Sequence, residues 1–595
     1  MSYTKIPLDD FTRQFAATTE LSSAALGGRV LSVSDEFFAE AYNLLLVEPA
    51  VSMKGQFGPN GALYSGWESR RHNPAYDWCI IQLGTSGSVV GFDIDTSHFN
   101  GNEAPEVSVE AFSGLATEQP SKDDSRVCLS LYRESPSDAR TQWVEILPRV
   151  PLGPTSRHLF RIPPTGGVNF VKLNMYPDGG IARFRVYGAV HAVHPQSPTE
   201  AFDLAHVFAG GRVEFTSDQH FGVGSNLILP GRGKDMGDGW ETKRSRQKDH
   251  KDWAIIKLGA PGALEQVEID TAHFKGNFPE SCELHAMVVS GEADWTASRG
   301  EAEDWTLILP RTKLGPHRQH YFQLENVQGR LFTHVKITIY PDGGIKRVRL
   351  VGTRGPASVS SDSSTAKESQ AVKTFAPAAR DVKAKGLVVP VLPLTPEAFA
   401  PFGQVVQAYG DHAAVPKGTS ITSANQGSAS KFHKLALLAA SYPAEAGATA
   451  GLSVYRCKPL QDIDSDGTTA LRIMERHPYT NQAFIPMGKG PREGLNDPGT
   501  QYLVVVARNG EGDRPDVDSV RAFLASASQG IVYDTAIWHQ PMTVLEKASA
   551  NGPKPCEAND FVKDMDFVCV ETQIGDGSVA DCEIIELVRP VWLRL

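Results

Sequence analysis

Two acids and a histidine gather in a short stretch of the first third of the chain. Asp95, His98 and Glu106 lie within about a dozen residues of one another, beside Gly101 and Asn102. Carboxylate and imidazole groups at this spacing provide a general base, a general acid, or oxygen and nitrogen ligands for a metal. The stretch is therefore a candidate catalytic centre.

The same residue types return in the second third of the chain. Asp270, His273 and Glu280 repeat the set. Further polar residues kept in both copies are Glu68 and Glu241, Arg71 and Arg244, Arg149 and Arg311, His158 and His320, and Asp178 and Asp342. A duplicated active site would retain such residues, and so would a duplicated structural role. Asp178 lies in a Pro-Asp-Gly-Gly turn sequence, which favours a structural role for it.

Three segments of the last third also carry polar residues suited to chemistry. They are Asn425-Gln426-Gly427 with Lys431-Phe432-His433, Glu475-Arg476-His477-Pro478 leading to Gln482, and Trp538-His539-Gln540-Pro541. The latter two resemble the two halves of a cupin metal site, where His and carboxylate or amide groups from facing strands meet in a small barrel. The alternative is that His477 and His539 lie on the barrel rim without a ligand.

Several common catalytic patterns are absent from the sequence. The chain contains no GxSxG, GxxxxGK, GxGxxG or HExxH pattern. Their absence disfavours nucleotide-dependent and serine-hydrolase chemistry. We therefore expect no nucleotide or organic cofactor.

The elements that must position the first two sets of residues form a duplication. Gly27-Gly28-Arg29-Val30 returns as Gly210-Gly211-Arg212-Val213, and the sequence YPDGGI occurs from Tyr176 and again from Tyr340. The repeated blocks are short apolar or alternating runs closed by Gly, Pro, Asp or Asn, which are typical of strands. We predict a mainly β protein with two tandem jelly-roll, galactose-binding-like β-sandwich domains at residues 1–195 and 196–353.

A change of composition marks a third domain. Residues 354–387 are rich in Ser, Ala and Lys, which predicts a flexible linker. Residues 388–595 are β-rich again and are expected to form a cupin-like β-barrel. Its strands are expected at 451–457, 482–486, 502–507 and 566–571. One helix is expected at 517–527, because Pro515-Asp516 precedes it and Gln529-Gly530 follows it.

Length, charge and cysteine content limit the class of protein. The 595 residues predict three or four domains. The chain has 58 Lys and Arg against 69 Asp and Glu, and its basic residues are scattered, so we expect small substrates and no nucleic-acid partner. Seven cysteines without a CxxC pair favour free thiols in a reducing compartment. No apolar run approaches the roughly 18 residues of a spanning helix, and the start lacks a signal-peptide pattern, so we expect a cytoplasmic protein without a membrane partner.

Long motifs carry a resemblance to two enzyme families. Residues 24–352 resemble allantoicase through GGRVLSVSDEFFAEAYNLL, GWESRRHNPAYDWCIIQLG and GFDIDTSHFNGNEAPEVSVEA, and the tandem duplication is that family's architecture as well. Residues 391–588 resemble ureidoglycolate lyase of the bacterial and fungal type through LTPEAFAPFGQVV, NQGSASKFHKL, MERHPYTNQAFIP, YLVVVA, RAFLASASQGIVYDTAIWHQP and DFVCVE. The chain departs from the second family at Gln540, where a second His often follows the first.

The two resemblances together imply a bifunctional enzyme of purine degradation. One part would hydrolyse allantoate to ureidoglycolate and urea, and the other would cleave ureidoglycolate to glyoxylate and a second urea. A tethered second site raises the effective concentration of the intermediate if the linker lets the sites approach. The alternatives are that only one half is catalytic, or that the chain is a ligand-binding protein made of jelly rolls and a cupin.

The allantoate reaction requires groups that bind the substrate carboxylate and protonate the departing urea. Arginine suits the first task, and an acid or a histidine the second. The catalytic candidates are Glu68, Arg70, Arg71, Asp95, His98, Glu106, Glu241, Arg244, Asp270, His273 and Glu280, with Arg149 and Arg311 as substrate-binding candidates. The second repeat has Lys243 where the first has Arg70, and either repeat or both could be catalytic.

The lyase reaction requires a base that removes the hydroxyl proton of ureidoglycolate as the C–N bond breaks. Glu475 and His539 are the catalytic candidates, and Asn425 and Lys431 the substrate-binding ones. His477, Gln482 and His539 are expected to hold a divalent metal, for which nickel, manganese and zinc are equally compatible. Because both families are oligomeric, the resemblance also implies a homo-oligomer.

Overall fold

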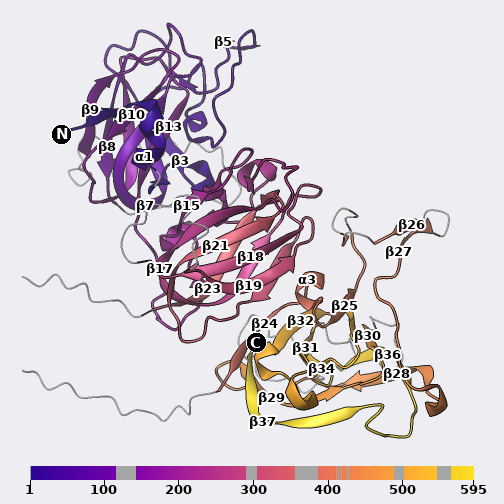
Figure 1. Ribbon diagram of the computed structural model, residues 1–595. Helices are drawn as coiled ribbons and strands as arrows, with labels where there is room; N and C mark the ends of the chain where they lie inside the picture. Colours follow the sequence, from indigo (N-terminus) through magenta and orange to yellow (C-terminus); the bar gives the residue numbers. More distant parts are fainter. Residues whose placement is uncertain are drawn as a thin grey trace, which may run out of the picture.

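The protein consists of three β-rich parts that follow one another along the chain. The computed structural model describes residues 2–15, 17–114, 143–289, 304–355, 386–410, 412, 415–416, 419–424, 428–487, 501–545 and 564–595. Figure 1 shows the three parts in a row, from indigo through pink to yellow. No helix in these ranges is long and apolar enough to cross a membrane.

The first part is a β-sandwich. Its elements are β1 (Thr4–Ile6), α1 (Phe11–Phe15), β2 (Thr19–Glu20), β3 (Arg29–Val33), β4 (Phe57–Gly58), β5 (Gly61–Ala62), β6 (Trp67–Glu68), β7 (Asp77–Asp95), β8 (Glu106–Phe112), β9 (Val144–Pro151), β10 (Arg157–Arg161), β11 (Gly167–Tyr176), β12 (Gly180–Ile181) and β13 (Arg183–Val190). Short 3-10 turns at Leu8–Asp10, Ala24–Leu26 and Ala41–Leu45 connect some of them.

Strand β7 belongs to both sheets of this sandwich, because its two halves have different neighbours. Residues 77–82 lie between β3 and β11, whereas residues 91–95 lie between β10 and β13, and all these pairings are antiparallel. Side chains along its first half alternate between buried and half-buried, as expected for a strand with one face in the core. The strand ends at Asp95, so it carries this candidate acid to one end of the sandwich.

The second part repeats this design and confirms the predicted tandem sandwiches. Its strands are β14 (Phe202–Asp203), β15 (Arg212–Thr216), β16 (Trp240–Glu241), β17 (Asp252–Asp270), β18 (Ser281–Met287), β19 (Thr306–Lys313), β20 (Gln319–Gln323), β21 (Phe332–Tyr340), β22 (Gly344–Ile345) and β23 (Arg347–Arg354). Its 3-10 turns are Val207–Ala209, Gly224–Ile228 and Met236–Asp238. β17 pairs with β15 and β21 in its first half and with β20 and β23 in its second half, as β7 does.

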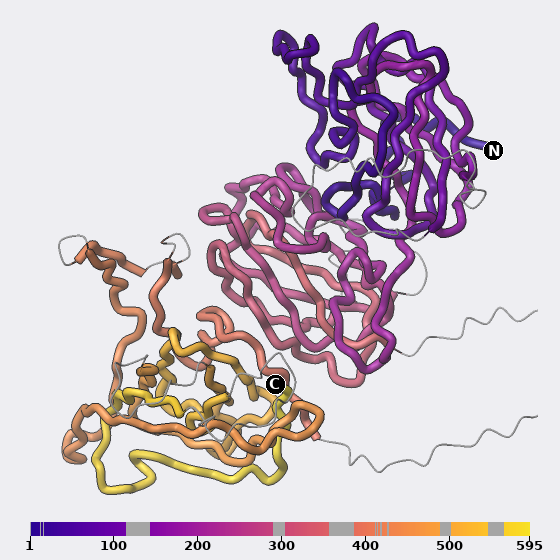
Figure 2. The backbone as a smooth tube through the Cα atoms, turned by 180° about the vertical axis from the view of Figure 1, so that it is seen from behind, coloured from indigo at the N-terminus to yellow at the C-terminus, as the bar shows by residue number. Residues whose placement is uncertain are grey.

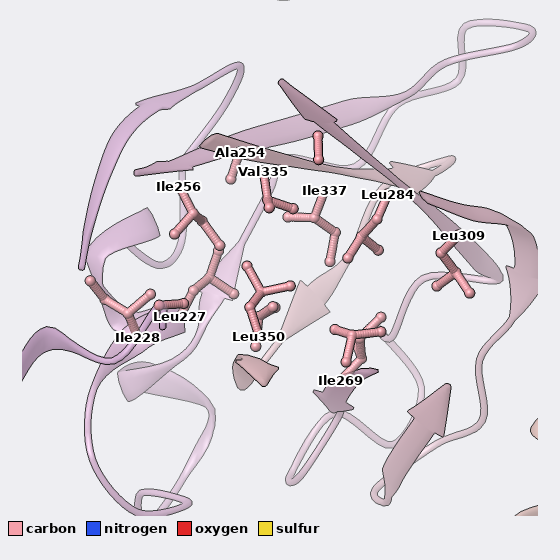
Figure 3. Close-up of a cluster of buried hydrophobic side chains, with 14 of the residues drawn as sticks. Leu227, Ile228, Ala254, Ile256, Ile269, Leu284, Leu309, Val335, Ile337 and Leu350 are labelled. Carbon is pink, nitrogen blue, oxygen red and sulfur yellow. The ribbon is translucent and has the colours of Figure 1, made fainter. Parts of the chain in front are cut away.

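The core of the second sandwich is a continuous apolar cluster. Ile256, Leu284 and Ile337 from three paired strands face Leu227 and Leu350 across the interior (Figure 3). Burial of each such side chain contributes about 1.5–3 kcal/mol relative to exposure. The alternating apolar positions of the sequence are therefore what joins the two sheets.

The third part is a closed barrel with a second sheet. Its elements are β24 (Val388–Pro393), α3 (Pro396–Phe399), β25 (Gly403–Val406), β26 (Ile421–Ala424), β27 (Ala429–Phe432), β28 (Thr449–Cys457), β29 (Thr468–Arg476), β30 (Gln482–Pro486), β31 (Gln501–Ala507), β32 (Arg521–Ser526), β33 (Gly530–Tyr533), β34 (Trp538–His539), β35 (Thr543–Leu545), β36 (Met565–Gln573) and β37 (Glu583–Arg594), with 3-10 turns at Ala444–Ala446, Glu511–Asp513 and Val517–Ser519. β32, β24, β37, β29, β34 and β31 pair in this order, and β31 pairs back with β32. This closed ring confirms the predicted barrel.

The five-stranded sheet β25-β33-β30-β36-β28 packs against the ring through aromatic side chains. Tyr502 of the ring lies 5.0 Å from Phe567 of the sheet, between ring centroids, in an edge-to-face arrangement. Phe484 contacts the same Phe567 ring. The four strands expected from the sequence in this part correspond to β28, β30, β31 and β36 and are confirmed.

The helix expected at 517–527 is wrong. Asp516 does cap a turn, since its side chain accepts a hydrogen bond from the backbone N–H of Asp518, but the turn ends at Ser519. Residues 521–526 form β32, which pairs with β31 on one side and β24 on the other. Two neighbouring strands satisfy the backbone of this segment, and this tertiary pairing outweighs the local start and stop signals.

The expected linker and the expected free thiols lie partly outside the described residues. Residues 356–385 of the expected linker lie outside the described residues. Of the seven cysteines, the five within the described ranges are free thiols, as expected.

Gly28 offers a test of how tightly the first sandwich is packed. A Cβ at this position would lie 2.0 Å from the carbonyl oxygen of Ser22, which is backbone and has little room to move. We expect Gly28→Ala to cost about 1–3 kcal/mol of stability, as other overpacking changes do. Gly166→Ala, where a Cβ meets nothing within 4 Å, is the matched control. Thermal unfolding measures both, and equal melting temperatures for the two variants would contradict the expectation.

Candidate active sites

The barrel brings two histidines and a glutamate together. Glu475 is the residue before the last in β29, and the pairing of β29 with β34 places it directly opposite His539. His477 follows β29 immediately. One ligand atom from each of Glu475, His477 and His539 lies within 4.8 Å of the others. The register of two strands and the strand end after Arg476 thus assemble the cluster.

Hydrogen bonds fix the orientation of both imidazoles. Nδ1 of His477 lies 2.7 Å from the carbonyl oxygen of Asp581, and Nδ1 of His539 lies 3.0 Å from that of Ile537. Because a carbonyl oxygen only accepts, each Nδ1 donates its proton, and each Nε2 is left with a lone pair. Both Nε2 atoms are buried without a hydrogen-bond partner. The Nε2 of His539 lies 3.6 Å from Oε1 of Glu475.

The surroundings keep these imidazoles neutral. Burial, together with the neighbouring His477, lowers the pKa of His539 to about 3. Burial also lowers the pKa of His477, against the effect of its hydrogen bond to Asp581. Burial and the nearby Glu571 raise the pKa of Glu475 to about 7. Two neutral imidazoles held by backbone carbonyls and aimed at a carboxylate are the donor set and the outer support that a divalent metal such as zinc, nickel or manganese takes.

Gln482 is buried, and its amide nitrogen is bonded to Glu571. Its Nε2 donates a 2.7 Å hydrogen bond to Oε2 of Glu571, and that oxygen lies 3.9 Å from Nδ1 of His477. Its Oε1 is buried without a hydrogen-bond partner. The Tyr533 ring stacks on His539 with centroids 4.0 Å apart. Glu475 thus joins the two histidines, and Gln482 adds a buried carbonyl oxygen without a hydrogen-bond partner.

The position that departs from the lyase pattern does not contribute to the cluster. Gln540 donates from Nε2 to Oγ1 of Thr543 at 3.2 Å. Gln540 follows the end of β34 at His539, and this bond directs its amide nitrogen to Thr543. A glutamine there leaves the histidine and glutamate cluster complete.

The remaining lyase candidates are not brought to the cluster in the described residues. Lys431 is exposed on β27, and the β26–β27 hairpin extends away from the barrel in both views (Figure 1, Figure 2). Asn425 lies outside the described residues.

In the first sandwich, Glu68 and Arg71 meet around the loop that contains Gly101. Glu68 is buried and accepts a 3.0 Å hydrogen bond from Asn102. Its burial raises its pKa, against the effects of Asn102 and Arg71. Arg71 donates to the carbonyl oxygen of Gly101 and lies 3.7 Å from Asp178. The arginine thus holds the loop in place.

The second sandwich repeats these contacts. Asn277 donates to Glu241 at 2.6 Å, and Arg244 donates to the carbonyl oxygen of Gly276 and to Asp342, both at 3.3 Å. Arg71 and Arg244 thus make the same two contacts in the two repeats, with Asp178 and Asp342 as the acidic partners. The asparagine that bonds each glutamate, Asn102 or Asn277, occurs in both copies, and this retention is the sequence signal for the contact.

Arg70 differs from its counterpart in the second repeat. Its exposed side chain pairs with Asp35 at 2.7 Å and lines a cavity of about 330 Å³. Ser34, Asn73 and Asp77 line the same cavity. Lys243 takes the place of Arg70 in the second repeat and is also exposed. The first repeat thus offers an accessible guanidinium beside hydrogen-bonding groups.

Asp95 and Asp270 end equivalent strands but have different partners. Each accepts a 2.8 Å hydrogen bond from the backbone two residues on. Asp270 in addition binds Arg232 through both of its oxygens, at 2.6 and 2.8 Å. Arg232 lies in a segment where the repeats differ in length, so comparison of the two copies could not reveal it. The carboxylate of Asp270 is therefore occupied by its own chain.

The retained histidines have two kinds of environment. His98 and His273 adopt the left-handed backbone region, at φ of 72° and 69°, which turns each chain at the end of its long strand. His98 is exposed, with Nε2 3.3 Å from the carbonyl oxygen of Ala50. His320 is fully buried and bonds the backbone N–H of Gly315 and the carbonyl of Ile269, and His158 likewise bonds Gly153, so the last two are structural.

The retained glutamates at 106 and 280 each pair with a retained arginine. Arg149 pairs with Glu106 and lies over the Tyr176 ring, and Arg311 pairs with Glu280 at 3.3 Å and lies over the Tyr340 ring. These four charged side chains are 38–55% exposed. The pairs form equivalent surface contacts in the two repeats.

Comparison with known proteins agrees with this architecture. The family model described as "Allantoicase repeat" matches residues 19–191 and 202–355, and the model described as "Ureidoglycolate lyase" matches residues 387–593. A probable allantoicase of Schizosaccharomyces pombe is 48% identical over 342 residues, which cover 57% of this chain and 93% of that protein. The allantoicase of Neurospora crassa is 47% identical over 356 residues, 59% of this chain and 96% of that protein.

A crystal structure of allantoicase from Saccharomyces cerevisiae is 39% identical, covers 59% of this chain and 100% of that chain, and has a TM-score of 0.49. Because both matched families are enzyme families, they favour an enzyme over the alternative of a ligand-binding protein made of jelly rolls and a cupin. The chain belongs to the allantoicase family, with a ureidoglycolate lyase domain joined to its C-terminal side.

Proposed function

We propose that the two reactions of this enzyme take place at two separate centres, one in the first sandwich and one at Glu475, His477 and His539. The enzyme acts in purine degradation: it hydrolyses allantoate to ureidoglycolate and urea, and it cleaves ureidoglycolate to glyoxylate and a second urea. The observation that carries the second assignment is the pair of buried Nε2 lone pairs beside a carboxylate.

At the lyase centre, Glu475, His477 and His539 would hold a divalent metal. When bound, such a metal supplies Lewis-acid stabilisation to the carboxylate and hydroxyl oxygens of ureidoglycolate. The Oε1 atom of Glu475 faces His539, and its Oε2 accepts a long, weak hydrogen bond from the thiol of Cys582. We assign to Glu475 the transfer of the proton from the substrate hydroxyl to the nitrogen that leaves as urea.

Gln482 and Glu571 suit recognition of the ureido group. Gln482 donates its N–H to Glu571, so its buried Oε1 is left as an acceptor without a partner. A ureido N–H supplies the missing donor, and a buried acceptor gains most from such a bond because leaving it unmade costs about 1–3 kcal/mol. We therefore assign Gln482 to substrate binding in this proposal.

His539→Ala and Gln540→Ala form a matched pair of neighbouring variants. We expect His539→Ala to lose bound metal and to slow glyoxylate formation by about 100-fold or more, because Lewis-acid stabilisation is worth several kcal/mol. Allantoate should then give one urea, with ureidoglycolate accumulating. Gln540→Ala should still give two urea per allantoate. Urea and glyoxylate are followed in time, corrected for spontaneous decay, and metal content is measured by mass spectrometry. Full lyase activity in metal-free protein would refute the metal role.

At the allantoate centre, the first repeat is the catalytic one in our proposal. Arg70 binds the substrate carboxylate, because a guanidinium forms two parallel hydrogen bonds with a carboxylate and the lysine of the second repeat cannot. Glu68, whose pKa is raised by burial, donates the proton to the departing urea, and Asp95 and His98 activate the water that replaces it. In the second repeat Arg232 already binds Asp270, which supports a structural role there.

Arg70→Ala and Lys243→Ala compare the same position in the two repeats. Loss of a charge-assisted hydrogen bond to the substrate is worth about 1.5–3 kcal/mol, so kcat/KM for allantoate should fall about 10- to 100-fold in Arg70→Ala. Lys243→Ala should leave it unchanged. Asp95→Asn and Asp270→Asn provide a second pair, in which the first lowers turnover and the second lowers the melting temperature because Arg232 loses its partner. A drop in turnover for Lys243→Ala alone would reverse the assignment of the repeats.

We also propose that the chain forms a homo-oligomer through the barrel. Among the described residues, β28 is the last strand of its sheet and pairs with β36 on one side alone. Its Leu452 and Val454 are 74% and 64% exposed. Exposed apolar side chains on a long edge strand favour pairing with another chain. We assign a second copy of this chain as the partner of this edge strand. The β26–β27 hairpin of the same part extends away from its own barrel, which leaves it free to contact that second copy (Figure 2).

Light scattering during size-exclusion chromatography tests this oligomer. We expect a mass that is a multiple of the monomer mass, and a shift to the monomer in Leu452→Lys, since an edge lysine opposes strand pairing. Leu8→Lys, at an exposed leucine of the first part, is the control. A monomer mass for the unmodified protein would end the proposal.

A further inference from the structure

The second sandwich and the barrel are in direct contact. β19 and β20 of the sandwich lie against α3, and β20 lies against β24 as well. The two parts lie side by side in both views (Figure 1, Figure 2). We infer that this face of the second repeat is a docking surface for the barrel of its own chain, so that the two enzymes form one unit that does not depend on the covalent linker.

Three arginine–carboxylate ion pairs cross the contact within the described residues, and Nε2 of His320 lies 3.9 Å from Oε2 of Glu397 as well. Arg318 lies 3.3 Å from Glu397, and these side chains are 13% and 8% exposed. Glu325 lies 2.8 Å from Arg521. Glu265 pairs with Arg594. In each pair the first residue belongs to the sandwich and the second to the barrel. Because charged side chains are seldom buried unless they are paired, the buried pair indicates a fitted interface rather than a chance approach.

The first repeat supplies an internal control for this inference. The block from Leu152 to Pro163 matches the block from Leu314 to Glu325 without a gap, with Gly-Pro and His-x-Phe at the same spacing. This match places Ser156 where the second repeat has Arg318, and Pro163 where it has Glu325.

Glu265, the third charged residue of the second repeat at this contact, also has an uncharged counterpart in the first repeat. In the long strands, the IDT sequences that end β7 and β17 place Val90 where the second repeat has Glu265. Ser156, Pro163 and Val90 cannot form ion pairs. The three charges that meet the barrel are therefore found in the repeat that contacts it, and the shared sandwich fold does not require them.

The corresponding face of the first repeat is covered in another way. β1 pairs with β10 along the edge that β20 turns toward the barrel. Ile6 and Phe15 of the N-terminal segment form a small apolar cluster with Val90 and Leu159. In the first repeat this edge is therefore covered by apolar side chains of the N-terminal segment. In the second repeat it carries charged side chains that pair with the barrel, as expected if that repeat is adapted to the fused domain.

The interface is polar and incompletely closed. A cavity of about 620 Å³ lies in it, lined by Tyr321 and Gln323 of the sandwich and by Leu392, Phe402 and Phe523 of the barrel. Interfaces between domains of one chain are commonly polar in this way. In such an interface charge complementarity decides which surfaces bind, so reversal of one charge should open it. The covalent linker keeps the two parts at a high effective concentration, so a weakened interface would still close in the intact chain. The linker therefore has to be cut before the interface is tested.

The experiment uses the full chain with a protease recognition sequence inserted between residues 356 and 385 and an affinity tag at the N-terminus. After cleavage and capture of the N-terminal piece, we expect the C-terminal piece of the unmodified protein to be retained. Arg318→Glu and Glu397→Arg, each alone, should lower retention about tenfold or more. The double variant Arg318→Glu with Glu397→Arg restores opposite charges and should restore retention.

Two controls separate loss of docking from loss of folding. Arg13→Glu removes an exposed ion pair with Asp10 in the first part and should not change retention. Both activities are measured in every intact variant before cleavage, and their persistence shows that the parts are folded. Release of the unmodified C-terminal piece on cleavage would overturn the inference. Full retention in both single variants, or release of the double variant with both activities intact, would do the same.

Discussion

The backbone ladders of two long strands are the constraint on which both sandwiches depend. β7 and β17 each run through two sheets, because their halves have different antiparallel partners. Each strand therefore joins the sheets by its own covalent chain as well as by the core between them. Each also ends in an aspartate at the same end of its sandwich. In the first copy, Asp95 is the last residue of β7 and His98 lies in the turn that follows it.

A duplication of this kind separates what the fold requires from what chemistry requires. Arg71 and Arg244 make equivalent contacts with an aspartate and a glycine carbonyl, which is a structural reason for both copies to retain them. Asp95 and Asp270 are both retained, yet Arg232 binds only the second. Retention of a residue in both copies thus has at least two physical causes, and the contacts of each side chain distinguish them. The charged residues of the second repeat that pair with the barrel are absent from the first repeat. Such a difference between two copies of one fold indicates a role that the fold itself does not require.

The barrel centre depends on burial acting on polar groups. Burial removes water from His477 and His539, which lowers both pKa values and keeps the imidazoles neutral. Backbone carbonyls take the Nδ1 protons, and the Nε2 lone pairs are left to face Glu475. The same low-polarity surroundings raise the pKa of Glu475 to about 7. A protein interior normally disfavours polar groups without hydrogen-bond partners. Here the two Nε2 atoms and the Glu475 carboxyl group are in a state that suits cation binding and proton transfer.

The sequence by itself determined the strand-rich class, the duplication and the two histidines of the barrel, because alternating apolar residues and repeated motifs are local properties of the chain. It also indicated the strands at 451–457 and 482–486. Tertiary structure decided what depends on partners distant in sequence. Residues 521–526 are a strand because β31 and β24 lie on either side, in spite of a local helix signal. Glu475 joins the histidines through strand register, Gln482 turns to Glu571, and Arg232 binds Asp270. Spacing along the chain cannot specify these contacts, since each is set by how separate strands pair and by which side chains the core encloses.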